Sequence, residues 1–139
     1  MFAKLKNLFG RGPTSEDLSP RQREGRDAED EGRRFLEARG YRCLAANHRT
    51  RYGEVDIIME DGDTIVFVEV KARGRTDYGR PEEFVSPAKQ AKIAKAALSY
   101  VKAHRLAKKP LRFDVLAFSP GGVEHLQNAF APPAWKYYL

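Results

Sequence analysis

The sequence of 139 residues has a single cysteine, Cys43, and only three histidines. One cysteine excludes an internal disulfide and any zinc site built from cysteines. His48, His104 and His125 are scattered and lack the short spacings of metal-ligating pairs, so we expect no zinc site. Cys43 lies in a short strand-like run, RCLAAN, and is predicted to be a small buried side chain.

Long apolar runs are also missing from the chain. None reaches the roughly 18 residues that a membrane span needs. Residues 1–13, MFAKLKNLFGRGP, have no continuous apolar stretch of the kind found in secretory signals. These absences predict a protein without a membrane span that works in the cytoplasm, where a reducing environment suits an unpaired cysteine.

Acidic residues are absent between Phe84 and Phe113, where eight lysines or arginines occur. A solvated helix usually mixes the two signs of charge, because opposite charges four residues apart stabilise it. The whole chain carries a formal net charge of +6. This balance favours an anionic partner such as nucleic acid or an acidic membrane surface, and an ordinary solvated basic face is the alternative.

Apolar residues make up 42% of the chain, which is enough for a globular protein with a core. A chain of this length is expected to fold as one domain. We predict a basic, flexible arm over residues 1–18, one domain over residues 19–130 and an aromatic, proline-rich tail over residues 131–139.

Local signals predict the element order αβββαββ, a mixed α/β unit with a central sheet flanked by helices. Ser19-Pro20 marks the start of the first helix, with Gln22 completing a capping box, and Gly40 marks its end. The remaining elements are expected to be a helix from Ser86-Pro87 to about His104, strands over residues 41–47, 111–118 and 123–126, and a hairpin over residues 53–71.

The predicted hairpin, GEVDIIMEDGDTIVFVEVK, is the most informative stretch of the chain. Asp61-Gly62 predicts a tight turn, and symmetric closure about it aligns Asp56 with Phe67 and Glu54 with Glu69. Because side chains alternate between the faces of a strand, one face is expected to be purely apolar. The residues assigned to that face are Val55, Ile57, Met59, Val66, Val68 and Val70.

The opposite face of the hairpin carries charged groups where a half-buried sheet should have none: Glu54, Asp56, Glu69 and Lys71. With the aligned register, Asp56 lies diagonal to Glu69 at a Cβ separation of roughly 7 Å or less. That separation is short enough for both carboxylates to hold one cation. Buried charges are costly, so these groups need a metal, a partner or a catalytic role.

Hydrolysis of a phosphodiester fits this set of residues. Asp56 and Glu69 supply the hard oxygen ligands that Mg²⁺ or Mn²⁺ prefers, and the carbonyl of Val70 can face the same ion. Such an ion lowers the pKa of its bound water, while Lys71 would position that water and stabilise the transition state. The alternative is an ordinary salt bridge between Glu69 and Lys71.

Other residues carry weaker signals. Glu29 projects at the border of the first helix's apolar stripe, where it either reaches a cleft or is an ordinary solvated side chain. Asp114 is expected to pair with Arg112 or to cap the sheet edge. Tyr78 and Phe84 either stack on bases or pack in the core. The cations predicted to contact nucleic-acid phosphates are Arg49, Arg73, Arg75, Arg80, Lys89 and Lys92.

Asp56 followed by Glu69-Val70-Lys71 resembles the PD-(D/E)xK signature of restriction-endonuclease-like nucleases, although Val55 stands where that motif has proline. Several further blocks occur in order with compatible spacing, over about residues 24–130. They resemble the uncharacterised bacterial YraN-type family, and they are Gly25 with Glu29, Gly40-Tyr41, Asn47-His48-Arg49, GEVDII, VFVEVKAR, Tyr78-Gly79, Lys89 and RFDVLAF.

This resemblance implies a restriction-endonuclease-like core of order αβββαβ, similar to that of archaeal Holliday-junction resolvases. It also implies catalytic roles for Glu29, Asp56, Glu69 and Lys71, and it makes a homodimer plausible. Glu54 would be a second-metal ligand or an electrostatic partner of Lys71 or of an arginine in the following loop, Arg73.

The sequence therefore predicts a Mg²⁺- or Mn²⁺-dependent endonuclease that acts on DNA, with branched or processed intermediates as candidate substrates. A different class of protein is the first alternative: a non-catalytic nucleic-acid-binding or adaptor module that has kept the nuclease fold. An endoribonuclease is the second, since nothing in the sequence reports on a ribose 2′-hydroxyl.

Overall fold

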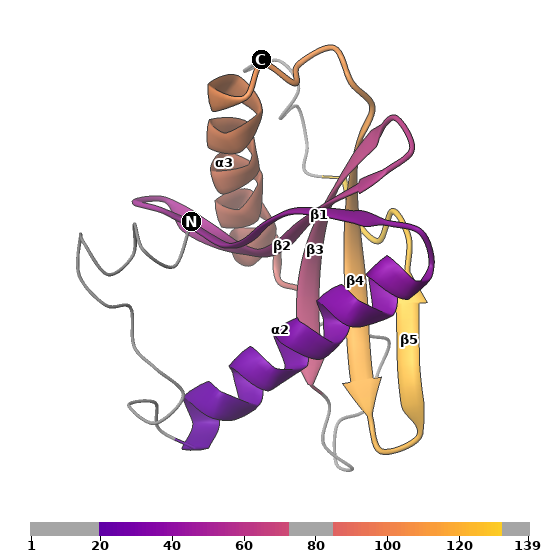
Figure 1. The fold of residues 1–139 in the computed structure, drawn as a ribbon. Helices are drawn as coiled ribbons and strands as arrows, with labels where there is room; N and C mark the ends of the chain where they lie inside the picture. Colours follow the sequence, from indigo (N-terminus) through magenta and orange to yellow (C-terminus); the bar gives the residue numbers. More distant parts are fainter. Residues whose placement is uncertain (1–19, 73–84, 132–139) are drawn as a thin grey trace, which may run out of the picture.

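The computed structural model describes residues 20–72 and 85–131, which are coloured in Figure 1. The predicted arm over residues 1–18 and nearly all of the predicted tail lie outside these residues. So do Ser19, Tyr78, Phe84 and the three loop arginines predicted to contact phosphates, Arg73, Arg75 and Arg80.

Two helices and five strands occur in the described part of the chain, in the predicted order αβββαββ. Gly40 follows the first helix with a φ of 93°, as expected for a helix-ending glycine. The Ser86 side chain accepts a hydrogen bond from the backbone N–H of Lys89 and so caps the second helix as predicted. The elements are α2 (Pro20–Ala38), β1 (Arg42–Thr50), β2 (Gly53–Asp61), β3 (Thr64–Ala72), α3 (Pro87–Ala103), β4 (Leu111–Ser119) and β5 (Gly122–Leu126).

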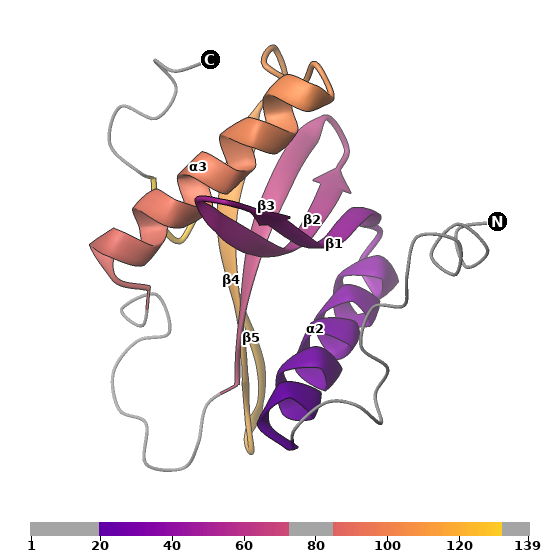
Figure 2. The ribbon, with the colours of Figure 1, turned by 90° about the vertical axis from the view of Figure 1, so that its left-hand side faces the viewer.

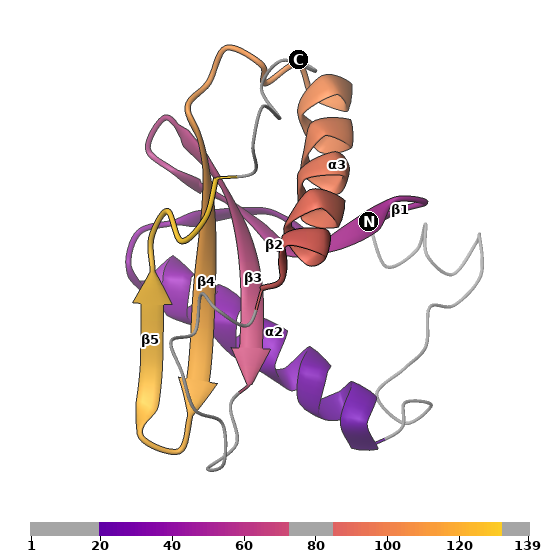
Figure 3. The same ribbon diagram turned by 180° about the vertical axis from the view of Figure 1, so that it is seen from behind.

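The five strands form one mixed sheet in the order β1-β2-β3-β4-β5. Three neighbouring pairs are antiparallel, and only β3 and β4 run parallel. A parallel pair needs a crossover connection, and helix α3 lies within the one that joins β3 to β4. Figure 3 shows α3 beside this parallel pair, with β5 at the far edge of the sheet.

The helices lie on opposite faces of the sheet, as Figure 2 shows, and each covers its own apolar cluster. On the α3 side, Ile93, Ala97 and Val101 pack against Ile58 and Phe67 of the central strands. On the α2 side, Leu36 packs with other buried side chains, which are Tyr41, Ile57, Met59, Val66, Val68 and Leu116. In the described residues, neither helix is long and apolar enough to cross a membrane.

The register of the central hairpin differs from the prediction. Asp61 pairs with Thr64 and Ile58 with Phe67, so Gly62 and Asp63 are the two central residues of the turn. Gly62 adopts a φ of 58°, the left-handed conformation that glycine enters without steric cost. A turn whose first central residue needs positive φ places Gly62 there, and the predicted alignments of Asp56 with Phe67 and of Glu54 with Glu69 are therefore wrong.

Val55 was also assigned to the wrong face. It packs in the α3-side cluster with Ile58, whereas Ile57 packs on the α2 side as predicted. The alternation of β2 breaks at Asp56, beyond the last recorded pair with β3, Ile57–Val68. The reason is local, because the Asp56 side chain takes the hydrogen bond of a β3 backbone N–H.

Candidate functional site

Two buried carboxyl groups lie where β2 and β3 cease to pair. Pairing of the two strands ends at Ile57–Val68, and Asp56 and Glu69 are the residues next to that last pair. Asp56 is 8% exposed and Glu69 is 5% exposed. Asp56 Oδ2 accepts a hydrogen bond of 2.9 Å from the backbone N–H of Val70, which ties the end of β2 to β3. The structure thus brings together the two acids that the sequence singled out.

Both acids hold protons more tightly than free carboxyl groups do. Burial, followed by the charge of Glu29, raises the pKa of Asp56 to about 6, against the lowering effect of the Val70 hydrogen bond. Burial and the charge of Asp56 raise the pKa of Glu69 to about 7. Like charges in a poorly hydrated site disfavour joint ionisation. A proton or a cation is therefore favoured between these groups at neutral pH.

Glu29 of helix α2 belongs to the same cluster of carboxyl groups. It is partly buried and hydrogen-bonds with Asp56 and with Asn47 of β1. Burial, together with the charges of Glu54 and Glu69, raises its pKa. The carboxylate oxygens of Glu29, Glu54 and Asp56 lie within 4.8 Å of one another, so these three residues could hold one cation.

Two lysines stand on the other side of Glu69. Lys89, in the first turn of α3, places its Nζ 2.5 Å from Glu69 Oε1. Burial acts to lower the pKa of Lys89, but the hydrogen bond and the charge of Glu69 outweigh it, so the pKa is raised. The Lys71 side chain lies near that of Lys89. Lys89, predicted from sequence as a phosphate contact, is thus placed in direct contact with a candidate catalytic acid.

Glu54 pairs with Arg49 in the described part of the chain, and Arg73, one of the partners considered from sequence, lies outside it. Glu54 Oε2 lies 3.1 Å from Nε of Arg49, the residue opposite it on β1, and both side chains are largely exposed. Surface ion pairs of this kind contribute little stability. Glu54 and Arg49 therefore remain available for other ligands, and Glu54 also belongs to the cation-sized cluster.

Local backbone features position this cluster. Asn47 has a φ of 52° inside β1, opposite the point where the alternation of β2 breaks. Gly53, at the start of β2, lies so close to α3 that an added Cβ would sit 3.0 Å from both the Cβ and the carbonyl oxygen of Lys92. Gly32 of α2 is similarly close to the sheet, with Leu116 Cδ2 at 3.0 Å. Each helix therefore packs closely against the sheet near the carboxyl cluster, α3 at Gly53 and α2 at Gly32.

The grouping of residues differs in part from the predicted one. Glu29, Asp56 and Glu69 lie together, and the catalytic roles that the resemblance implies for them and for Lys71 stay predictions. Sequence reasoning missed the pair of Lys89 with Glu69 and the contact of Asn47 with Glu29, because each joins elements that are distant in the chain. Val70 contributes its N–H to Asp56, and a metal-binding role for its carbonyl stays a prediction.

A third buried acid, Asp114 of β4, is surrounded by protein groups that hydrogen-bond with it. It is fully buried and accepts hydrogen bonds from Nε of Arg112 at 2.9 Å and from the backbone N–H of Asn128 at 2.9 Å. His125 Nε2 lies 2.8 Å from its second oxygen. Burial alone would raise the pKa of Asp114, but these partners lower it. The predicted pairing with Arg112 is confirmed, and the carboxylate's oxygens are occupied by protein partners.

Cys43 is half-buried beside a β-bulge in β1 rather than fully buried, and its Sγ lies 3.7 Å from the carbonyl oxygen of Ala45. An irregular strand packs its side chains less completely than a regular one. This thiol lies on β1, and no contact in the described residues links it to the carboxyl cluster.

Comparison with known proteins gives a consistent family. The family model described as "Uncharacterised protein family UPF0102" matches residues 28–118. A UPF0102 protein of Bordetella avium is 43% identical over 132 residues, which cover 95% of this chain and 90% of that protein. One of Syntrophus aciditrophicus is 47% identical over 112 residues, covering 78% and 88%, and one of Aeromonas hydrophila is 39% identical over 132 residues, covering 94% and 95%. The resemblance to YraN-type proteins is thereby confirmed.

Proposed function

The chain belongs to the uncharacterised protein family UPF0102, and from that premise we propose that it is a metal-dependent phosphodiester hydrolase, an endonuclease that acts on DNA in the cytoplasm. The single observation that carries the proposal is the convergence of four carboxyl groups at one end of the β2–β3 hairpin. Glu29, Glu54 and Asp56 have oxygens within 4.8 Å of one another, and burial together with the nearby charge of Asp56 raises the pKa of Glu69.

The chemistry of these donors fits Mg²⁺ or Mn²⁺. Carboxylate oxygens are the hard ligands that both ions prefer, and no sulfur or imidazole ligand that would favour zinc belongs to the cluster in the described residues. Burial and neighbouring carboxylates raise the pKa values of Asp56 and Glu69, so added positive charge would stabilise their ionised forms. A bound divalent ion would supply that charge, acidify a water and neutralise a phosphate.

The protein's own residues have separate tasks in this proposal. Glu29, Asp56 and Glu69 would orient the ion and accept protons, since their pKa values are raised from the ordinary range of carboxyl groups. Lys71 and Lys89 stand beside Glu69. Their ammonium groups would bind the scissile phosphate and stabilise the charge that develops on it. The ion pair between Lys89 and Glu69 would break when the Lys89 ammonium binds the phosphate instead.

The architecture agrees with the restriction-endonuclease-like core that the sequence resemblance implies. The element order includes αβββαβ, the sheet is mixed, and the two strands that carry the acids are adjacent. Fold analogy sets only a reaction class, so the proposal rests on the side chains. The net charge of +6 supports a polyanionic substrate.

Cleavage assays test the proposal against its alternatives. Labelled linear, flapped, four-way-junction and single-stranded DNA, and RNA, would be incubated with Mg²⁺ or Mn²⁺. We expect metal-dependent cutting of DNA by the wild type, and a fall of at least about 100-fold in Glu69→Gln and Lys71→Ala. Glu124→Gln, on the exposed edge of β5, is the matched control and should cut normally.

Binding measurements separate the outcomes. Glu69→Gln should bind DNA about as well as the wild type, because it removes a carboxylate and leaves the basic residues in place. Binding of every substrate without cutting, by a folded protein in either metal, would reject the hydrolase and support the non-catalytic module. Cutting confined to RNA would instead support the endoribonuclease.

A further inference from the structure

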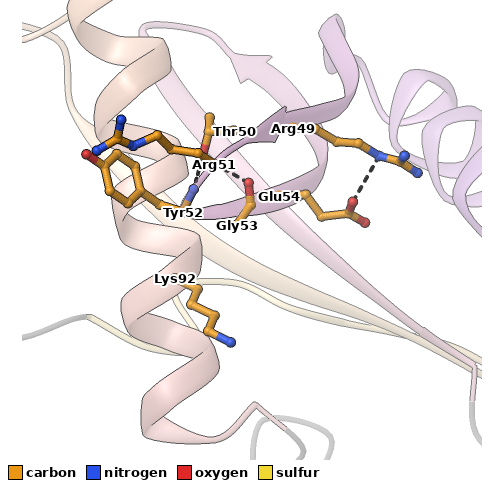
Figure 4. Close-up of a pocket in the computed structure, with 7 residues that line it drawn as sticks. All are labelled: Arg49, Thr50, Arg51, Tyr52, Gly53, Glu54 and Lys92. Carbon is orange, nitrogen blue, oxygen red and sulfur yellow. Dashed lines mark hydrogen bonds and ion pairs between the residues drawn. The ribbon is translucent and has the colours of Figure 1, made fainter.

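An exposed tyrosine surrounded by cations lies at the tip of the β1–β2 hairpin. Tyr52 is 48% exposed, and the only other large apolar side chain of comparable exposure in the described residues is Val123, at 38%. The Arg51 guanidinium carbon lies 4.9 Å from the centre of the Tyr52 ring, and Lys95 Nζ of α3 lies 5.8 Å from it. Figure 4 shows Tyr52 and Arg51 together at the turn, with Lys92 of α3 below them.

The turn that presents Tyr52 is well fixed. Thr50 Oγ1 accepts a hydrogen bond of 3.1 Å from the backbone N–H of Tyr52 and donates one of 3.0 Å to the carbonyl of Gly53. The backbone of Gly53 rests directly on α3 at Lys92. The aromatic ring is therefore held at a defined place on the surface, and presenting it to a ligand requires little further ordering.

Two adjoining hollows, together called the groove below, lie between this tyrosine and the first turn of α3. A hollow of about 400 Å³ is lined by residues 49–54 and Lys92. A second hollow, of about 360 Å³, lies against Glu54, Lys89 and Lys92, and the two share Gly53 as well. Lys89 contacts Glu69. The two hollows therefore adjoin, one beside the exposed aromatic ring and the other beside Lys89, which contacts Glu69.

The charge of the groove is strongly positive. Its described lining carries four cationic side chains, Arg49, Arg51, Lys89 and Lys92, and one acid, Glu54. Lys95 adds a fifth positive charge beside Tyr52. Cations along a groove bind successive phosphates of a nucleic-acid strand, while an aromatic ring stacks on a base only when that base is unpaired.

We propose that this groove binds an unpaired segment of a nucleic-acid strand, with one base stacked on Tyr52 and its phosphates on Arg51, Lys92 and Lys95. This inference rests on the proposed function and names its substrate class: nucleic acid with single-stranded character next to the scissile bond. Tyr52 precedes Asp56 by four residues, about 13 Å of extended strand. A short stretch of the bound strand could therefore reach from the Tyr52 ring to the candidate catalytic acids.

Binding measured without metal tests the inference separately from catalysis. Fluorescence anisotropy in EDTA would compare a labelled single-stranded oligonucleotide, the same strand as a blunt duplex, and heparin, a polyanion that has no bases. We expect Tyr52→Ala to weaken single-strand binding by about 5- to 150-fold and to change duplex and heparin binding by less than about 2-fold. Tyr52→Phe should bind as the wild type does, because it keeps the ring.

Matched variants complete the test. Val123→Ala, which removes the other exposed apolar side chain, should leave all three affinities unchanged. Lys92→Ala should reduce the slope of log affinity against log salt by about 0.7 for single strands. Because Tyr52 is exposed, thermal unfolding of its variants should match that of the wild type.

The inference would be overturned if folded Tyr52→Ala bound the single strand as tightly as the wild type does. It would also be overturned if Tyr52→Ala lost the same affinity for the single strand, the duplex and heparin. Absence of any oligonucleotide binding by the folded wild type would overturn it as well. Tyr52-dependent binding by a protein that cuts nothing would leave the groove in place and reject the hydrolase. Metal-dependent cutting that is equal in the wild type and in Tyr52→Ala would support the hydrolase and reject the role of the groove.

Discussion

Asp56 and Glu69 make the stability of the metal-free protein depend on pH. Their pKa values are about 6 and about 7 in the folded protein, above the ordinary values of 3.8 and 4.5. Between about pH 4 and pH 7, the folded state therefore holds more protons than the unfolded chain. Stability must fall as pH rises through this window, and the loss is complete above pH 7. We expect a decrease on the order of 2–4 kcal/mol for the coupled pair.

Urea unfolding in EDTA at pH 5 and pH 7.5 measures this effect. The double variant Asp56→Asn with Glu69→Gln should be less sensitive to pH, because the amides do not titrate. Asp114, whose pKa is lowered, contributes a change of opposite sign only below about pH 4. Equal wild-type stability at the two pH values would contradict the assignment of raised pKa values.

Asp114 should be important for stability and unimportant for catalysis. Removing its carboxylate would leave the guanidinium of Arg112 and the imidazole of His125 without their shared buried partner. We expect Asp114→Ala to lower the free energy of unfolding by about 3–5 kcal/mol. Asp63→Ala, at the exposed hairpin turn, should change it by less than about 0.5 kcal/mol. Denaturant titration measures both, and a mild effect of Asp114→Ala would show that the network tolerates its loss.

At the residue scale, the sequence predicted which acids lie together. It predicted less well which cations lie beside them. Asp56, Glu69 and Lys71 could be identified because charged groups interrupt an apolar hairpin. The partner of Glu69 could not, because Lys89 is twenty positions away and reaches it through the crossover helix. Asn47 carries its signal in a left-handed backbone conformation, which composition does not reveal.

At the scale of elements, the close approach of the β1–β2 hairpin to α3 depends on Gly53. An added Cβ would sit 3.0 Å from two atoms of Lys92, one of them in the backbone, so the hairpin or the helix would have to move. We expect Gly53→Ala to lower stability by about 1–3 kcal/mol. It should also reduce phosphodiester cleavage, because the same movement displaces Glu54.

Gly25→Ala is the matched control for this variant. Gly25 lies in α2 with no atom within 4 Å of an added Cβ, and alanine favours the helix by up to about 1 kcal/mol. Thermal unfolding of the two variants side by side gives the comparison. If Gly53→Ala were as stable and active as Gly25→Ala, the contact with α3 would not position the site.

Element order was predictable from caps, turns and apolar periodicity, whereas strand register was not. The Ser86-Pro87 start and the Gly40 end carry strong local signals, and both helices follow them. The hairpin register depended on which residue of Glu60-Asp61-Gly62-Asp63 takes the positive φ, and a shift of one position moved every cross-strand pair. In the observed register, Asp56 and Glu69 adjoin the last strand pair, Ile57–Val68, and Asp56 accepts the hydrogen bond of the Val70 N–H.

At the scale of the whole molecule, the excess of positive charge should make nucleic-acid binding depend on salt. Four exposed cations lie together at the groove near Tyr52: Arg49, Arg51, Lys92 and Lys95. Neutralising about four phosphates predicts a loss of duplex affinity of roughly 100-fold between 50 and 200 mM salt. Anisotropy titrations at several salt concentrations measure the slope. A slope near zero would show that phosphates contribute little to binding.

The proposed function depends most on the binding of a divalent cation by the carboxyl cluster. Calorimetric titration of Mn²⁺ into the metal-free protein at pH 7.5 tests it without knowledge of the substrate. We expect saturable binding by the wild type, and binding at least about 10-fold weaker in Asp56→Asn, because that variant removes a ligand from the centre of the cluster. Absence of saturable binding by the wild type, or equal binding by Asp56→Asn, would contradict the claim.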